Sequence, residues 1–179
     1  MKKRFFSIII LLLCFTLIVG CGKSDNKEVN DNVDNSSNTS EGLTRKQIYN
    51  RLDKIYSDTV ELWNNVFCEV DWYTSYGTSS IGEELDIDYV LAHAKEYYDT
   101  VIKNKDFVNT LNDDYNEVKA VYEKIVDKAT IIYNNIMNEK PVANQKISYR
   151  NELDLYGEYQ RDFYQKIYDA YMQGENKRD

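Results

Sequence analysis

The residues that could carry out chemistry are few in this chain. His93 is the only histidine and no Glu-x-x-His motif is present, so a di-iron centre built on two histidines is excluded. Ser79 and Ser80 lie in the loop YGTSSIGEEL, shortly before the predicted helix that carries His93. A serine hydrolase also needs a base, an acid that orients it and an oxyanion site. The residues around these serines supply no such set.

The acidic side chains and Cys68 give no stronger signal of catalysis. Glu83 and Glu84 are adjacent carboxylates at the start of a predicted helix, where charge–dipole attraction commonly places them. Cys68 belongs to no nucleophile motif, and the charge of Glu69 raises the pKa of its thiol. The Asp and Asn residues of segment 22–42 do not form the calcium-loop motif. The sequence therefore predicts no catalytic residue, no cofactor and no metal site, and we expect no enzymatic activity.

The first predicted helix instead suggests chemistry of surface recognition. Opposite its apolar stripe lie Cys68 and Trp72, with Asn65 and Tyr76 nearby. A tryptophan and a free thiol are unusual on the polar side of an amphipathic helix. They form either a second packing face against another helix or a patch for a protein partner, because Trp and Tyr dominate interface hot spots. The loop 77–84 adjoins this candidate patch.

The N-terminus has the layout of a secretory signal peptide. Residues 2–4 are basic, and the apolar run 5–20 follows them. This run falls short of the roughly 20 residues that a membrane-spanning helix needs. The stretch LIVGC, which ends at Cys21, resembles the lipobox of bacterial lipoproteins. That resemblance implies cleavage after Gly20 and acyl chains such as palmitate on Cys21, with an uncleaved membrane anchor as the alternative.

The chain is predicted to have three regions: the lipoprotein signal peptide 1–20, the lipidated cysteine and a disordered tether in 21–42, and one helical domain in 43–179. The tether has no aromatic residue, and Val29 and Val33 are its only aliphatic ones. Such a segment buries too little apolar surface to offset the entropy of ordering it. A flexible chain of this length has a root-mean-square span of about 25 Å.

The charge of the chain restricts its partners. Loss of residues 1–20 removes three basic residues and no acidic one, which leaves 19 basic and 30 acidic residues and a net charge of −11. A polyanion of this kind repels nucleic acid, so no nucleic-acid partner is expected. It also repels an anionic leaflet, so membrane contact is expected through Cys21 alone. With Cys14 cleaved off and Cys21 lipidated, Cys68 has no disulfide partner.

The folded region is predicted to be all-α, an antiparallel bundle of about four helices, three long and one shorter. Thr44 and Gln47 form a capping box at the start of the first helix. Asp106 is the predicted cap of the third helix, and Pro141 ends it. The predicted helices span 43–76, 86–103, 107–140 and 144–173. The stripe of the first comprises Ile48, Leu52, Ile55, Thr59, Leu62, Val66, Val70 and Tyr73.

Tyrosine is abundant in the last predicted helix, whose residues 156–171 read YGEYQRDFYQKIYDAY. We expect most of these rings to pack in the core with their hydroxyls at its rim, rather than to form a binding strip. Tyr164 and Tyr171 lie just beside the apolar face, and Tyr159 and Tyr168 lie on its flanks. The face itself comprises Tyr149, Leu153, Tyr156, Phe163, Ile167 and Ala170.

These observations favour a lipid-anchored bacterial surface protein at the extracytoplasmic face of the cell membrane. Its predicted role is that of a non-enzymatic module that contacts another protein through the candidate patch Asn65, Cys68, Trp72 and Tyr76. The alternative is a sensor or receptor that binds a small ligand in an aromatic-lined cavity between the helices. A cavity of several hundred cubic ångströms within the core would favour the alternative, and a solid core would favour the module.

Overall fold

The structure is a computed structural model that describes residues 39–175 of the 179-residue chain. The predicted signal peptide, Cys21 and residues 22–38 of the predicted tether lie outside the described residues. Throughout the described residues the regular structure is helical, and no strand occurs among them. The prediction of an all-α fold is confirmed.

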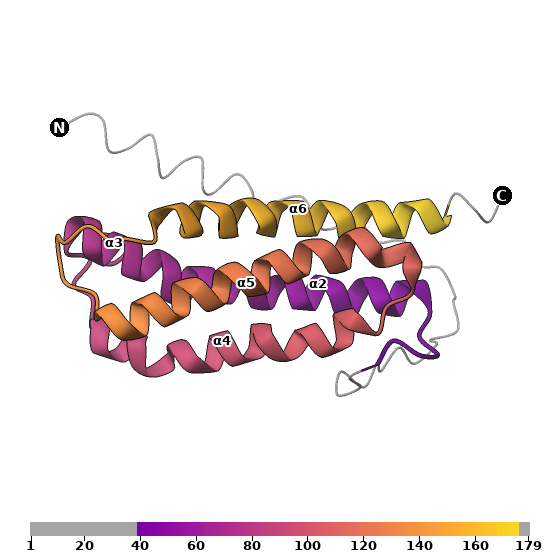
Figure 1. Ribbon diagram of the computed structural model, residues 1–179, viewed down its shortest axis with the longest axis horizontal. Coiled ribbons are helices and arrows are strands. Elements are labelled where there is room, and N and C mark those ends of the chain that lie inside the picture. The colour runs from indigo at the N-terminus through magenta and orange to yellow at the C-terminus, as the bar shows by residue number, and fades with distance from the viewer. Residues whose placement is uncertain (1–38, 176–179) are drawn as a thin grey trace, which may run out of the picture. The chain divides into compact units, whose positions relative to one another are not determined.

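The helices form an antiparallel bundle (Figure 1). The first helical rod consists of α2 (Arg45–Leu62), a π-helical segment η1 (Trp63–Phe67) and α3 (Cys68–Tyr76). It is followed by α4 (Ile87–Asn109), a short 3-10 turn η2 (Asp113–Tyr115), α5 (Asn116–Glu139) and α6 (Arg150–Glu175). Each long helix packs on the next along the chain, and α6 returns to pack on α2. The predicted four-helix bundle is therefore confirmed.

The two ends of the bundle differ in the segments that build them. At the end that we call distal, α3 and α5 finish and α4 and α6 begin (Figure 1). At the other, the entry end, the described chain starts at Thr39 and α2 begins. The sequence places Ser40 in the tether, but its backbone N–H donates to Thr110 Oγ1 at 2.8 Å and its hydroxyl donates to the Thr110 carbonyl at 2.6 Å. The chain is thus fastened to the turn after α4 before the first helix starts.

Two of the predicted helix starts follow from local capping chemistry and are confirmed. At the start of α2 the Thr44 N–H donates to Gln47 Oε1 at 2.9 Å, and the Gln47 N–H donates to Thr44 Oγ1 at 3.3 Å. Each end of this capping box satisfies an N–H that has no partner within the helix. At the start of α4 the Asp86 carboxylate accepts the Tyr89 N–H at 3.0 Å.

The predicted boundary between the second and third helices is wrong. Asp106 caps no helix and lies inside α4. The helix that was predicted to be short, α4, has 23 residues and is nearly as long as α5, which has 24. The apolar face continues through Phe107 and Val108, which are buried, so α4 extends until that face is complete. The turn comes after Thr110, where Asn112 accepts the Asp114 N–H at 3.1 Å.

The start of the last helix was also predicted too early, at Asn144. This residue has a φ of +58°, which is left-handed, and α6 begins at Arg150. The left-handed region excludes the residue from a right-handed helix. The predicted end of the third helix at Pro141 is confirmed: α5 finishes at Glu139, and Lys140, with a φ of +43°, has left the helix. The residue before a proline avoids helical geometry. The segment 140–149 is therefore a loop that crosses the distal end.

The core contains the residues that the apolar stripes predict. Every residue in the stripe of the first helix is buried except Tyr73, which is half-buried. Every residue of the face predicted for the last helix is buried too, including Tyr149, which lies just before α6. The tyrosines of α6 divide between core and rim. Tyr156 is fully buried, Tyr171 is half-buried against the Tyr49 ring at 4.6 Å, and Tyr164 and Tyr168 are exposed. The aromatic stretch is thus partly core and partly surface.

Buried tyrosine hydroxyls are paired with backbone carbonyls. The Tyr122 hydroxyl donates to the Val101 carbonyl at 2.7 Å, and the Tyr156 hydroxyl donates to the Thr59 carbonyl at 3.0 Å. The Tyr156 ring lies 6.1 Å from the stacked ring of Trp63 and 5.1 Å from the edge-on ring of Phe67, both in η1. The wider π-helical turn therefore occurs where α2 accommodates a large ring from α6.

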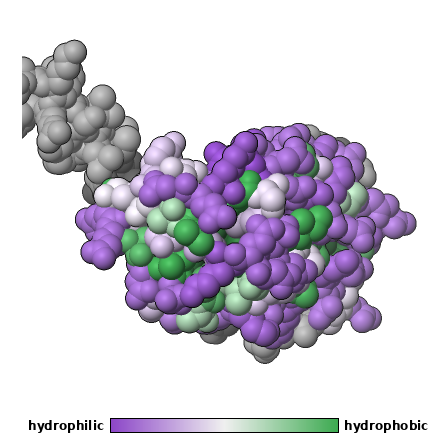
Figure 2. All heavy atoms as spheres, turned by 60° about the vertical axis from the view of Figure 1, so that its left-hand side comes forward, coloured by the Kyte–Doolittle hydropathy of each residue, from purple (hydrophilic) through white to green (hydrophobic). Residues whose placement is uncertain are grey.

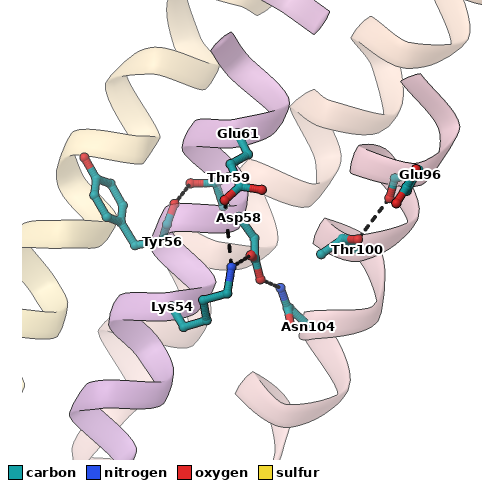
Figure 3. Close-up of polar contacts among 8 residues, drawn as sticks. All are labelled: Lys54, Tyr56, Asp58, Thr59, Glu61, Glu96, Thr100 and Asn104. Carbon is teal, nitrogen blue, oxygen red and sulfur yellow. Dashed lines mark hydrogen bonds and ion pairs between the residues drawn. The ribbon is translucent and has the colours of Figure 1, made fainter. Parts of the chain in front are cut away.

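A buried polar layer crosses the middle of the bundle and connects α2 to α4 (Figure 3). The Asp58 carboxylate accepts a hydrogen bond from Asn104 Nδ2 at 2.8 Å and one from Lys54 Nζ at 2.5 Å. Asp58 and Asn104 are both buried, and a buried carboxylate is stable only when it is paired in this way. On the adjacent residue of α2, the Thr59 hydroxyl accepts a hydrogen bond from Gln160 Nε2 of α6 at 3.2 Å. These hydrogen bonds fix the positions of α4 and α6 along α2, because a shift of either helix would break its pair.

The buried tyrosines predict a steep loss of stability at alkaline pH. Burial is the main cause that raises the pKa values of Tyr122, Tyr149 and Tyr156, and nearby charge adds to it. An unfolded tyrosine loses its proton near pH 10, so above pH 10 unfolding releases protons and the free energy of unfolding falls as pH rises. Below pH 10 these three tyrosines add no pH dependence to the free energy of unfolding. We expect a slope of about 4 kcal/mol per pH unit above pH 10 if all three stay protonated until unfolding.

Tyrosinate absorbance and far-ultraviolet circular dichroism, followed together from pH 9 to 13, measure this effect. The three buried residues are expected to ionise only with the loss of helix. Complete ionisation of all tyrosines in a chain that keeps its helical signal would contradict the packing described above.

Candidate interaction surface

The structure exposes the aromatic part of the candidate patch. Trp72 is 38% exposed and Tyr76 is 64% exposed, and their ring centroids lie 4.8 Å apart. Both belong to α3, close to the distal end. Asn65 is exposed but lies in η1, about two turns earlier, and Cys68 is half-buried between them. The two rings contact each other; the Tyr76 side chain is mostly in solvent, whereas most of the Trp72 surface is covered.

Further apolar side chains are exposed at the same end; the sequence analysis named the loop 77–84 but none of these side chains. Ile81 in the loop 77–86 is 77% exposed, and Tyr89 in the first turn of α4 is 64% exposed. Met137 near the end of α5 and Val142 in the loop 140–149 are also exposed. Figure 2, which brings this side of the molecule forward, shows apolar residues gathered between hydrophilic ones. We call Trp72, Tyr76, Ile81, Tyr89, Met137 and Val142 the distal apolar set.

The loop 77–86 is held in shape by hydrogen bonds to itself and to α3. Ser79 is buried, its N–H donates to the Glu83 carbonyl at 2.8 Å, and its hydroxyl accepts the Glu83 N–H at 3.1 Å. The Ser80 N–H donates to Glu69 Oε2 at 3.1 Å, and the Ser80 hydroxyl donates to the other oxygen of the same carboxylate. Exposed Ile81 therefore projects from an ordered loop.

The residues considered for catalysis are occupied by these structural contacts. The Ser79 and Ser80 hydroxyls bond to the loop and to Glu69, and exposed His93 has its Nδ1 atom 2.9 Å from the Tyr89 carbonyl of its own helix. Burial raises the pKa of the Cys68 thiol, and the charge of Glu69 adds to this, which favours the unreactive protonated form. Among residues 39–175, no three His, Cys, Asp or Glu side chains gather as metal ligands would.

A surface cavity of about 430 Å³ adjoins Tyr76. One wall comes from α3, and the other comes from the loop 140–149 and the start of α6. The two walls are bridged by an ion pair in which Arg150 Nη1 donates to Asp71 Oδ1. The residues that give the cavity its chemistry are Asp71, Tyr76, Asn144, Lys146, Ile147 and Arg150.

The two walls also meet through the backbone at the end of α3. The Tyr73 carbonyl accepts the Gly77 N–H at 2.8 Å and the Asn144 N–H at 3.3 Å. Gly77 has a φ of +74°, and a Cβ atom placed on it would lie 3.0 Å from Asn144 Nδ2. A glycine is needed here because the chain turns through the left-handed region and the loop 140–149 passes close to it.

Comparison with known proteins gives no relative for this chain: no family model, no curated protein and no solved structure matches it. In addition, no helix among the described residues is both long enough and apolar enough to cross a membrane.

Substitution of Gly77 tests the junction between α3 and the loop 140–149. We expect Gly77→Ala to lower the free energy of unfolding by about 1.5 kcal/mol, because alanine is strained at positive φ and its Cβ requires the Asn144 amide to shift by a small distance. Gly82→Ala is the matched control, since Gly82 has a φ of +83° and its added Cβ would meet nothing within 4 Å. The control is expected to lose about 1 kcal/mol from backbone strain alone.

Urea denaturation of both variants measures the difference between them. Equal losses in the two variants would show that the contact between Gly77 and Asn144 contributes nothing to stability.

Proposed function

We propose that the protein is a lipid-anchored, non-enzymatic bacterial surface module that contacts another protein through its distal end. In this proposal the acyl chains on Cys21 hold it at the extracytoplasmic face of the cell membrane, and the tether separates the bundle from the bilayer. The observation that supports the contact most strongly is the exposed ring pair of Trp72 and Tyr76. Aromatic residues of this kind supply most of the binding energy at protein interfaces.

The position of the distal apolar set is consistent with this role. The described chain enters the bundle beside Thr110, at the entry end, and the distal end lies one helix length away. For α4 this length is about 35 Å. A tether that joins the bundle at its entry end leaves the distal end accessible to a neighbouring protein. The strongly negative chain opposes direct adsorption of the bundle to an anionic leaflet.

The packing of the core favours this function over the binding of a ligand between the helices. Rings from facing helices occupy the interior: Tyr122 lies 5.0 Å from Phe163, and Tyr156 lies against Phe67. The hydroxyls of Tyr122 and Tyr156 already have backbone partners. The cavity at the distal end contains none of these core rings, and apart from buried Thr74 its lining residues are exposed or half-buried.

Replacement of the anchoring cysteine tests the membrane attachment. We expect the wild-type protein to incorporate labelled palmitate and the Cys21→Ser variant to incorporate none, because only a thiol at the lipobox position accepts the diacylglyceryl group. Cys68→Ser is the matched control and is expected to be labelled like the wild type. Label in the Cys21→Ser protein, or no label in any of the three, would contradict a lipid anchor at this residue.

Removal of the exposed rings tests the protein contact. In cells treated with a chemical crosslinker, we expect the Trp72→Ser, Tyr76→Ser double variant to lose the crosslinked species of the wild-type protein by about tenfold or more. The matched control replaces two exposed tyrosines of α6, Tyr164 and Tyr168, with serine and is expected to keep those species. Unchanged crosslinking in the first variant, with an unchanged melting temperature, would exclude the ring pair as the contact.

A further inference from the structure

The cavity beside Tyr76 carries a local charge opposite to that of the domain around it. Residues 39–175 contain 15 basic and 25 acidic residues, a net charge of −10. The cavity has two cationic side chains, Lys146 and Arg150, and one carboxylate, Asp71. Its net charge is therefore +1. A positive site on a negative domain can attract anions that the rest of the surface repels.

The two cations of the cavity have different roles in the geometry. Arg150 is held in place by its ion pair with Asp71, which neutralises the charge of the guanidinium. The guanidinium has five N–H donors in a planar fork, and Asp71 occupies only part of them. Lys146 is exposed and makes no ion pair with any residue that the structure describes. One positioned fork and one uncompensated ammonium group thus line the same space. The start of α6 at Arg150 adds the partial positive charge of a helix N-terminus.

The cavity also has an apolar side. Tyr76 is largely exposed, yet its ring is supported by Trp72, with 40° between the ring planes. Ile147 is half-buried on the opposite wall. An aromatic or aliphatic body between Tyr76 and Ile147 would cover apolar surface that is otherwise in water, with a gain that scales with the area covered. The volume of about 430 Å³ lies within the range of small-molecule sites.

We propose that this cavity, framed by Tyr76, Lys146 and Arg150, is a binding site for a small organic monocarboxylate with an aromatic or apolar body. The carboxylate lies between Lys146 and the free edge of the Arg150 fork, and the body lies against the Tyr76 ring. A net charge of +1 matches a monoanion, whereas a dianion such as a phosphate ester would leave one negative charge unmatched beside Asp71. A neutral ligand would leave the Lys146 charge without a partner.

The hydrogen bonds at the Tyr73 carbonyl make the cavity a preformed site. They fix the end of α3, which carries Asp71 and Tyr76, to the loop that carries Lys146 and Ile147. A preformed site binds its ligand without a cost for ordering its walls. The site does not depend on the protein contact proposed above, and it can be tested without any partner.

Ligand-detected NMR with the full-length chain in micelles of an uncharged detergent tests this site. The probe is phenylacetate, the neutral control is phenylacetamide, and the dianionic control is phenyl phosphate. We expect phenylacetate to bind saturably and about tenfold more tightly than the amide, the difference that one charge-assisted hydrogen bond typically makes. Phenyl phosphate is expected to bind more weakly than phenylacetate.

Two variants connect the binding to the proposed residues. Lys146→Gln is expected to weaken phenylacetate binding by about tenfold, because it removes the uncompensated charge. Lys103→Gln is the matched control, since Lys103 is also an exposed lysine but lies on α4, and it is expected to bind like the wild type. Equal binding of acid and amide, tighter binding of the phosphate ester, equal effects of the two variants, or no saturable binding would each overturn the proposal.

Discussion

The distal end of the bundle depends on one backbone group, the carbonyl of Tyr73. This oxygen accepts the N–H of Gly77, which ends α3, and the N–H of Asn144, which belongs to the loop before α6. The carbonyl thus completes the last turn of α3 and, through its second hydrogen bond, also joins two segments that are far apart in the sequence. The Asp71–Arg150 ion pair bridges the same walls. The exposed rings of α3 and the cavity beside them keep their positions because this junction fixes both sides.

The aromatic residues elsewhere in the bundle differ from Trp72 and Tyr76 in their surroundings. Inside the bundle, large aromatic residues are buried and their hydroxyls are paired, as for Tyr122 and Tyr156. Buried polar groups such as Asp58 and Asn104 are paired as well. Folding therefore accounts for the aromatic residues of the core. It does not account for the exposed parts of Trp72 and Tyr76, whose rings contact each other on α3, at the end of the bundle away from the entering chain.

Much of the fold could be predicted from the sequence, because its signals are local. The apolar stripe of the first helix, the capping box at Thr44 and the stop at Pro141 each depend on neighbours within a few residues. The end of α4 was predicted too early because Asp106 is a typical capping residue, whereas the structure uses the turn signal at Asn112. The start of α6 was missed because tertiary contacts stabilise the left-handed Asn144. Trp72 and Tyr76 share one helix face and could be predicted together. Ile81, Met137 and Val142 could not, because only the topology brings their segments to one end.

We propose that the anchored protein meets its partner through the distal end of the bundle. A photoreactive amino acid placed at a single position and activated in intact cells tests this claim directly. The account predicts a discrete crosslinked product when the probe replaces Tyr76 and none when it replaces Tyr168, an exposed tyrosine on the side of α6. The same products from both positions, or a product from Tyr168 alone, would contradict it.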